Sequence, residues 1–566
     1  MVISNLSLFL LLGISGPAPS SAGELSVALQ PQVEADGDIA EIGIEERFRP
    51  DKIVPGEPLL ELRHVYSNVP TVARQIEVQA WDDLGLLPLV ARDSGEGTSG
   101  KREWFPLREG SGAVRVRYSA PVTAENAPMG AAPPIELRSE AGTVSGSGST
   151  FLVRPASGDF KVRIAWDLAH MGSASGLTTI SDQIPVRSPG VTFDTSYFMA
   201  GQFHRHPLGQ STNGFSAAVQ GKPPFEAQPV LAWMDGLYDR YLELFGKASA
   251  PYAVFMRRNV VNPGGGMGYD GGFVVTYGNT MDTADIEDLK STITHEMFHT
   301  FQPMMISGDS PGESLASSWF NEGLAVFYQV VLPRRFGLDD ADAFLRQLNF
   351  AAGRYYTNVM ANLPESEVPA GFWADTRIRT LPYDRGFLFF AAIDARIREV
   401  SGGKRSLDDL MLEWRRRQDA GQPVTKALVE ELLARELGPD GPRELQRVLA
   451  GGSPLPPSNA FGPCFRRVQK SLRRYELGFA PKVLTEPRRF VRDLVPGSAA
   501  ERAGLRNGDE ILKPVGQDRI QGDQEGILSL LVSRGSEQKT ISYKPRGETV
   551  RAWQWEKVAD RGQQCR

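Results

Sequence analysis

The chain has 566 residues, of which 41% are hydrophobic. That share supports large packed cores and argues against a wholly disordered protein. The length exceeds that of one ordinary domain, so we expect about three or four domains. The formal net charge of −6 at pH 7 argues against a nucleic-acid-binding protein, because contact with phosphates needs a basic face.

An apolar run, VISNLSLFLLLGISG, lies near the N-terminus. It is too short to span a bilayer comfortably. Prolines follow it, and the small residues Ser20, Ser21 and Ala22 stand where signal peptidase cuts. We therefore predict a signal peptide over residues 1–22, and the alternative is a buried N-terminal segment. The mature protein is expected to be exported, periplasmic or secreted, with no transmembrane anchor.

Residues 23–190 are predicted to form a β-sandwich-like domain. Short runs with β-branched or alternating apolar residues recur there. They are ELSVALQPQV, RQIEVQAWDD, AVRVRYSAPV, STFLVRP and FKVRIAWDL. Turn-forming stretches such as APMGAAPP and SGSGST separate them.

Residues 191–453 begin with a mixed pattern and continue with a helical one. Strands are predicted at APYAVFMRR and GGFVVTYGN, with the glycine-dense loop VVNPGGGMGYDGG between them. Helical patterns dominate from residue 282, where Asp282 can cap the segment TADIEDLKSTITHEMFHTF. A linker is predicted over 454–467, followed by a compact β-rich module over 468–557.

The chain has two cysteines, Cys464 and Cys565. A zinc cluster built on several cysteines is therefore excluded. In an oxidising compartment the two residues can pair. Two free thiols are the alternative, and the sequence leaves both open.

Two histidines, His295 and His299, lie four residues apart in HEMFH. At about 100° per residue they fall opposite the apolar stripe of their helix. That stripe consists of Ile286, Leu289, Ile293 and Met297. Histidines at this spacing can direct two ring nitrogens at one metal ion, with Glu296 beside them as a base. The alternative is a solvated polar face that carries two histidines by chance.

A third metal ligand is predicted in WFNEGLAVFYQ, where Glu322 lies on a helical segment among apolar neighbours. A carboxylate on an apolar face is costly unless its charge is compensated, and Zn²⁺ would compensate it. The alternatives are a buried salt bridge with an arginine and a glutamate at a helix start. Three protein ligands with one open position are typical of catalytic zinc, so we predict one Zn²⁺.

A family resemblance follows from these motifs. HEMFH followed by NEGLA resembles the thermolysin-like zinc peptidases, also called gluzincins. LPYDRGFLFFAAID resembles the Y-x-[KR]-G segment of related aminopeptidases. This resemblance implies that Tyr383 is a second catalytic residue, which donates a hydrogen bond to the oxyanion.

The C-terminal module resembles a PDZ domain. FVRDLVPGSAAERAGLRNGDEILKPVG matches the PDZ signature in residue order. Upstream, RRYELGFAP resembles the loop and strand that hold a peptide carboxylate, with Leu477, Gly478 and Phe479 as its core. Such a module binds an extended peptide as an added strand, and the alternative is a module that only packs against the catalytic part.

The whole chain resembles the glycyl aminopeptidase family. This implies a multidomain α+β protein with an N-terminal β domain, a thermolysin-like catalytic domain over 191–453 and a C-terminal PDZ domain. The catalytic domain would have a β subdomain and a helical subdomain. The family's activity is zinc-dependent removal of N-terminal glycine or alanine, so the expected partners are a peptide or protein substrate and a peptide ligand of the PDZ domain.

The sequence departs from related aminopeptidases at one segment, G-[GA]-[ML]-E-[NH], whose glutamate holds the substrate's amine. The matching substrate-binding residues here are Gly265, Gly266, Met267 and Gly268, so glycine replaces that glutamate. Asp270 is a candidate substitute. An endopeptidase, which needs no amine site, therefore remains an alternative.

The motifs together predict zinc-dependent peptide hydrolysis. His295, His299 and Glu322 would bind the ion and Glu296 would act as the base. Residues 273–277 are predicted to pair with the peptide as an edge strand. A different class of function is a peptide-binding scaffold with structural zinc, which needs a fourth ligand. Its candidates are Tyr383, His204 and His206.

Overall fold

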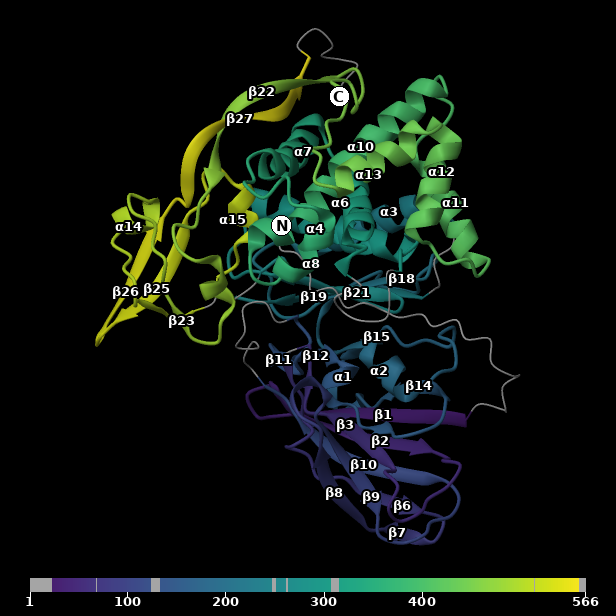
Figure 1. The fold of residues 1–566 in the computed structure, drawn as a ribbon. Coiled ribbons are helices and arrows are strands. Elements are labelled where there is room, and N and C mark those ends of the chain that lie inside the picture. The colour runs from purple at the N-terminus through teal and green to yellow at the C-terminus, as the bar shows by residue number, and fades with distance from the viewer. Residues whose placement is uncertain are drawn as a thin grey trace. The chain divides into compact units, whose positions relative to one another are not determined.

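The computed structural model describes residues 23–67, 69–123, 133–246, 251–260, 263–306, 315–513 and 515–558 (Figure 1). The predicted signal peptide lies outside the described residues. The chain divides into two compact units, residues 23–290 and 291–558. The division falls within helix α4 (Thr283–Phe301), so the predicted catalytic range spans both units and the predicted domain boundaries stay predictions. Among the described helices, none is long and apolar enough to cross a membrane.

Among its described residues before position 202, the first unit contains three sheets of four or more strands, besides the two-stranded pair β4 (Val65–Tyr66) and β5 (Val69–Pro70). The largest has the order β14-β1-β2-β10-β6-β7. Its strands are β14 (Phe160–Trp166), β1 (Gly23–Val33), β2 (Ile39–Phe48), β10 (Val114–Pro121), β6 (Gln79–Asp82) and β7 (Gly85–Leu87). The second is β13 (Arg154–Pro155), β3 (Leu60–Arg63), β9 (Lys101–Pro106) and β8 (Leu89–Ser94). The third is β11 (Arg138–Glu140), β12 (Thr143–Ser147), β16 (Tyr197–Gly201) and β15 (Ser175–Thr178).

Alternating burial explains why these segments form strands. On β10, Val114, Val116, Tyr118 and Ala120 are buried and the residues between them are more exposed, as expected for a sheet with one packed face. The run STFLVRP departs from the prediction, because its first part forms helix α1 (Gly148–Phe151). The turn predicted at SGSGST is also wrong in part, because strand β12 continues to Ser147. The Ser147 hydroxyl accepts a hydrogen bond from the amide of Ser149, and such a cap favours a helical turn over an extended chain.

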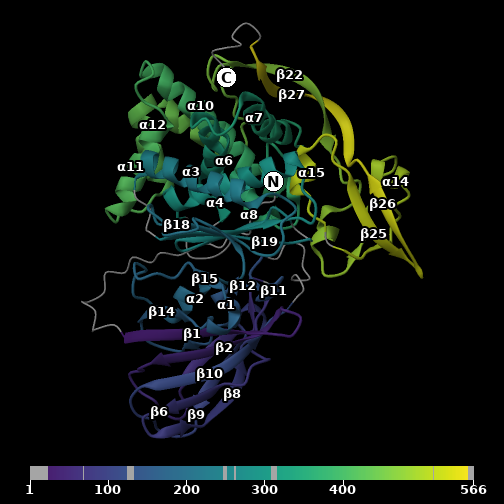
Figure 2. The same ribbon diagram turned by 180° about the vertical axis from the view of Figure 1, so that it is seen from behind.

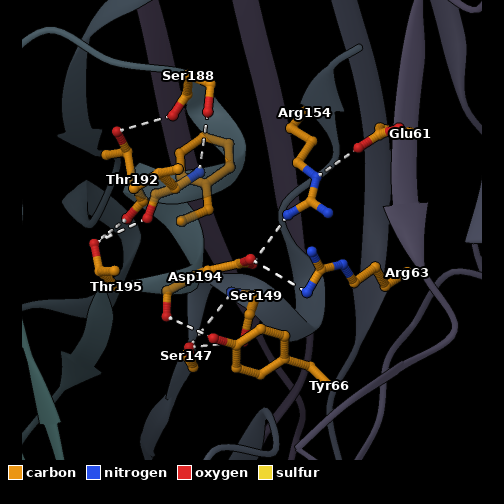
Figure 3. A network of polar contacts seen from close by, with 12 residues as sticks. Glu61, Arg63, Tyr66, Ser147, Ser149, Arg154, Ser188, Thr192, Asp194 and Thr195 are labelled. Atoms are coloured by element: carbon orange, nitrogen blue, oxygen red, sulfur yellow. Dashed lines mark hydrogen bonds and ion pairs between the residues drawn. The ribbon is translucent and has the colours of Figure 1, made fainter. Parts of the chain in front are cut away.

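A buried arginine joins three parts of this unit (Figure 3). Arg154, on β13, donates to Glu61 of β3 at 3.2 Å and to Asp194 at 2.9 Å. Asp194 ends helix α2 (Pro189–Asp194) and also pairs with Arg63 at 3.6 Å. The two carboxylates compensate the charge of the arginine, which is what a buried guanidinium requires.

A five-stranded mixed sheet completes the first unit, with the order β17-β18-β19-β21-β20. Its strands are β17 (His204–His206), β18 (Phe215–Val219), β19 (Tyr252–Arg258), β21 (Gly272–Tyr277) and β20 (Gly266–Tyr269), and helix α3 (Ala227–Phe245) packs on β17 and β18. The predicted edge strand at residues 273–277 is wrong, because β21 lies between β19 and β20. The glycine-dense segment folds back as β20, which pairs antiparallel with β21 and forms the edge.

The second unit begins with helices. They are α6 (Ser318–Arg335), α7 (Ala341–Tyr356), α8 (Val368–Gly371), α9 (Thr376–Arg379), α10 (Leu381–Val400), α11 (Leu407–Asp419), α12 (Lys426–Leu437) and α13 (Asp440–Leu449). Helices α6 and α10 pack against each other (Figure 1). Both are buried over most of their length, as expected for helices that are apolar on more than one side.

The β-rich C-terminal module contains two sheets. The first and last strands of the module, β22 (Phe465–Tyr475) and β27 (Arg546–Lys557), form a long two-stranded antiparallel sheet. The other sheet is β23 (Arg489–Phe490), β24 (Glu510–Ile511), β25 (Leu528–Arg534) and β26 (Glu537–Tyr543). Both views show the two-stranded sheet beside α7 (Figures 1 and 2). There the Asn349 side chain donates to the carbonyl of Trp555 at 2.8 Å and accepts from its amide at 2.7 Å.

Candidate metal centre

Helix α4 carries the two histidines, and its start is capped as predicted. The Asp282 carboxylate accepts from the amide of Asp285 at 2.9 Å, and Asp285 accepts from the amide of Asp282 at 3.2 Å. This reciprocal pair satisfies amides that the first helical turn leaves without partners.

The histidine face of α4 is largely buried, and the His299 side chain is 22% exposed. His295 is 5% exposed and its neighbour on the same face, Thr292, is 4% exposed. The opposite stripe is also packed, with Ile293 and Met297 fully buried. The alternative of a solvated polar face is therefore wrong, and buried imidazoles need partners.

His295, His299 and Glu322 converge on one point. Their ligand atoms all lie within 4.8 Å of one another. The Nε2 atoms of the two histidines are 3.1 Å apart, and Glu322 Oε2 lies 3.2 Å from His295 Nε2 and 3.7 Å from His299 Nε2. Ligands about 2.0–2.1 Å from a tetrahedral zinc ion are about 3.3–3.4 Å apart, so the three donors fit that ion.

Gln329 fixes the orientation of His295. Its Oε1 lies 3.0 Å from His295 Nδ1, so a proton on Nδ1 leaves Nε2 as the electron-pair donor that faces the cluster. Gln329 Nε2 in turn donates to Ser291 at 2.6 Å, and Ser291 donates to Gln347 at 2.9 Å. We did not predict Gln329, although a signal exists: it lies seven residues after Glu322 on the same helix and so on the same face.

The pKa shifts of His299 and Glu322 favour the protonation states that bind a cation. Burial, followed by the charge of His295, lowers the pKa of His299 to about 4 and outweighs the attraction of Glu322. Burial acts to raise the pKa of Glu322, but the two histidines and Tyr383 outweigh it and lower that pKa. His299 is therefore neutral and Glu322 ionised near neutral pH, which are the forms that bind metals. Burial lowers the pKa of His295, but contact with Glu322 raises it overall.

Glu296 and Tyr383 border the same cluster. Glu296 is 5% exposed, and its charge acts to raise the pKa values of both His295 and Tyr383. The ring of Tyr383 stacks near that of His295, with centroids 6.2 Å apart. The Tyr383 hydroxyl faces Glu322 and acts as a long hydrogen-bond donor that lowers the pKa of that carboxyl, and it has no shorter hydrogen bond among the described residues. A hydroxyl held only by so long a contact can still donate to a ligand.

Two glycines set the distance between Glu322 and Tyr383. A Cβ placed on Gly323 would lie 2.4 Å from the Cα of Gly386, and one placed on Gly386 would lie 2.2 Å from the carbonyl oxygen of Trp319. Only glycines allow such a close approach of two helix backbones. The glycines of the NEG and YDRG segments therefore bring α6 and α10 together beside the cluster.

The predicted substrate-binding residues lie in the first unit. Gly265 precedes β20, and Gly266, Met267 and Gly268 are on it. A Cβ at Gly268 would meet no described atom within 4 Å, so the position has open space where related enzymes carry a glutamate.

Two of the other candidate residues, Asp270 for the substrate's amine and His206 for a fourth metal ligand, have partners within the first unit. Asp270 accepts from Thr195 at 2.9 Å and pairs with Arg187. His206 lies 2.9 Å from Asp235. Among the described residues, the group of His295 is the one set of three or more potential ligands, and it contains neither His204 nor His206.

Most groups of the predicted PDZ loop already contact other residues of the same module. Leu477 and Phe479 are buried in the module's hydrophobic core. The carbonyl of Leu477 accepts from the Tyr543 hydroxyl at 2.7 Å, and that of Gly478 accepts from the amide of Val495 at 2.7 Å. Within RRYELGFAP the described strand β22 ends at Tyr475, and no strand follows it before the 3-10 helix η4 (Pro481–Thr485). Cys565 lies outside the described residues, so its pairing with Cys464 stays a prediction.

Comparison with known proteins defines the fold. No family model and no curated protein matches the sequence. The structure aligns with an aminopeptidase N family protein from Idiomarina loihiensis at a TM-score of 0.62 and 14% identity, over 93% of this chain and 97% of that chain. An M1 zinc metallopeptidase from Deinococcus radiodurans, solved with a Tyr-Ser-Ala substrate, aligns at a TM-score of 0.43 and 17% identity, over 77% of this chain and 94% of that chain.

The first of these structures shows that the chain has the multidomain α+β fold of an aminopeptidase N family protein. The predicted fold class is confirmed to that extent. At such low identity a shared fold does not define an activity. The narrower resemblance to glycyl aminopeptidases, and the PDZ assignment, stay predictions.

Proposed function

We propose that the protein is a zinc-dependent peptidase. The observation that carries this proposal is the convergence of His295, His299 and Glu322 within 4.8 Å, with Glu296 and the buried hydroxyl of Tyr383 beside them. Two imidazoles and one carboxylate leave a fourth position for water or substrate, which is the arrangement of a catalytic zinc site. A structural site would use four protein ligands.

The proposed roles follow from the chemistry of each side chain. A bound Zn²⁺ would polarise the scissile carbonyl and lower the pKa of a water molecule. Glu296 accepts the proton of the attacking water and passes it to the leaving amine. The Tyr383 hydroxyl donates a hydrogen bond to the oxygen on which negative charge develops. Gln329 holds His295 in the tautomer that the site needs.

The fold and the motifs favour an aminopeptidase-like enzyme that prefers small N-terminal residues. An endopeptidase is the second candidate, and Gly268 is the observation that favours it. This glycine has open space on its side-chain side, whereas an amine site needs a carboxylate to compensate the positive charge. Asp270, the predicted substitute, is already paired with Arg187.

One experiment separates these readings. A set of peptides, each free and N-acetylated, is incubated with zinc-loaded protein and with Glu296→Gln as the control. Trimming of free N-termini alone identifies an aminopeptidase, and internal cleavage of acetylated peptides identifies an endopeptidase. We expect Glu296→Gln to keep its zinc and to lose about 10²–10⁴-fold in kcat. If that variant keeps full activity, or if the wild-type protein cleaves neither kind of peptide, the proposed function is wrong.

Two further parts of the proposal rest on sequence alone. Export rests on the apolar residues 1–22. Peptide binding by the C-terminal module rests on its PDZ-like motifs. Both await direct measurement, by N-terminal sequencing of the mature protein and by titration with C-terminal peptides.

A further inference from the structure

A short helix of the C-terminal module lies against the start of the helix that carries Tyr383. This helix, α15 (Asp518–Gly522), contacts α7 and α9. Arg379, the last residue of α9, donates to both carboxylate oxygens of Asp518, at 2.6 and 3.1 Å. The Thr376 hydroxyl also donates to Asp518. A buried carboxylate with this many donors is held in one position.

A side-chain hydrogen bond links the start of α10 to α15. Thr380 occupies the N-cap position of α10, where a threonine hydroxyl ordinarily accepts from the helix's own amides. Within the described residues its side chain makes no such cap. The hydroxyl instead donates to Gln521 of α15 at 3.3 Å. Tyr383 follows three residues later, in the first turn of α10.

A second connection runs through Arg354, which is fully buried on α7. It donates to both oxygens of Asp384 at 2.7 and 2.8 Å and to the carbonyl of Asp518 at 3.2 Å. Asp384 is adjacent to Tyr383. One arginine therefore ties α15 to the residue next to the tyrosine, through a bidentate pair whose geometry is narrowly defined.

The Tyr383 hydroxyl has no short hydrogen bond among the described residues, only a long contact with Glu322. The position of this hydroxyl therefore depends on the backbone of the first turn of α10. That turn is held by charged groups that are buried and costly to separate, because each would be left without its partner. A displacement of α15 would therefore also displace Tyr383.

We infer that Asp518 and Gln521 are positioning residues, through which the C-terminal module holds the Tyr383 hydroxyl in its productive place. The inference rests on the proposed function. The module would then set the rate of turnover from a distance, without contacting the substrate. This makes the C-terminal module a part of the catalytic unit and not only a peptide-binding accessory.

The test uses the full-length chain and the variant Asp518→Asn, which keeps the shape and removes the charge. We expect kcat to fall by about 10-fold with KM within about 2-fold, because the tyrosine acts only on the developing charge. The same substitution in a Tyr383→Phe background should cause no further loss, because the group through which it acts is absent. Should Asp518→Asn fail to fold, Gln521→Ala removes the acceptor of Thr380 and is measured in its place.

The matched control is Asp509→Asn. Asp509 is also buried in the C-terminal module and accepts two hydrogen bonds from Arg534, both at 2.6 Å. The Asp509→Asn variant therefore shows how kcat changes when the C-terminal module is destabilised and α15 is unchanged. We expect its kcat to stay within about 2-fold of wild type.

Hydrogen exchange of the zinc-free protein provides a readout that does not depend on activity. Asp518→Asn should speed exchange in the peptide over residues 376–386, and Asp509→Asn should not. Equal effects of the two variants on exchange and on kcat, or a further loss in the Tyr383→Phe background, would overturn the inference. If the wild-type protein cleaves no peptide, the proposed function fails, while the exchange data still decide whether α15 holds the start of α10.

Discussion

Replacing Gly323 with alanine is expected to displace the two helices that carry Glu322 and Tyr383. The new Cβ would lie 2.4 Å from the Cα of Gly386, and ordinary contact begins at 3.4 Å, so the backbones must separate by about 1.0 Å (3.4 − 2.4). A displacement of about 1 Å at a reacting group costs about 10²-fold in rate. The extra methyl group destabilises the folded state by about 1–3 kcal/mol through overpacking. Replacing glycine by alanine within a helix stabilises it by about 1 kcal/mol.

The expected result is therefore a loss of kcat by about 10²-fold with a net destabilisation of only about 0–2 kcal/mol. Peptide cleavage, zinc content and thermal unfolding are measured on the same preparation. The control is Gly236→Ala in α3, where a Cβ meets no described atom within 4 Å and alanine should stabilise by about 0.5–1 kcal/mol. A Gly323→Ala protein with wild-type kcat would show that the helix crossing does not set the geometry of the site.

Two further predictions concern a metal-ligand support and a buried acid. Gln329→Ala should weaken zinc binding about 10–100-fold, because His295 loses the group that orients it; competition with a chelator measures this, and unchanged affinity contradicts it. Burial raises the pKa of Glu46 from 4.5 to about 8 despite a hydrogen bond from Tyr118. The folded state therefore holds a proton that the unfolded state releases, so stability falls as the pH rises from about 4.5 to 8. Glu46→Gln should remove that loss and stabilise the folded state by about 3 kcal/mol at pH 7 and by almost nothing at pH 4. Thermal unfolding of the variant and the wild type is measured at both pH values, and an equal stabilisation at pH 4 and pH 7 would contradict the prediction.

The convergence of His295, His299 and Glu322 was predictable because most of its sequence signals are local. The spacing of His295 and His299, the cap at Asp282 and the carboxylate at Glu322 each depend on helical periodicity over a few residues. Helical neighbours three or four residues apart lie on one face in any context. Motifs on α4, α6 and α10 could therefore be recognised without knowing how the helices pack.

The remaining features depend on contacts between distant segments. The order of strands in the mixed sheet made β20 the edge in place of β21, and no pattern within either strand encodes that order. The run STFLVRP is apolar in a way that suits both a strand and a buried helical turn, and the cap at Ser147 selects the turn. The role of Asp518 was also out of reach, because its partners lie more than a hundred residues away on α7 and α9.

The buried hydroxyl of Tyr383 has a consequence for how the protein tolerates change. Phenylalanine would fill the same space and keep the packing of the ring, and it would remove only the hydroxyl. In the peptidase that we propose, such a variant keeps its fold and loses a hydrogen bond to the developing negative charge. Selection for activity, and not selection for folding, would then keep a tyrosine at this position.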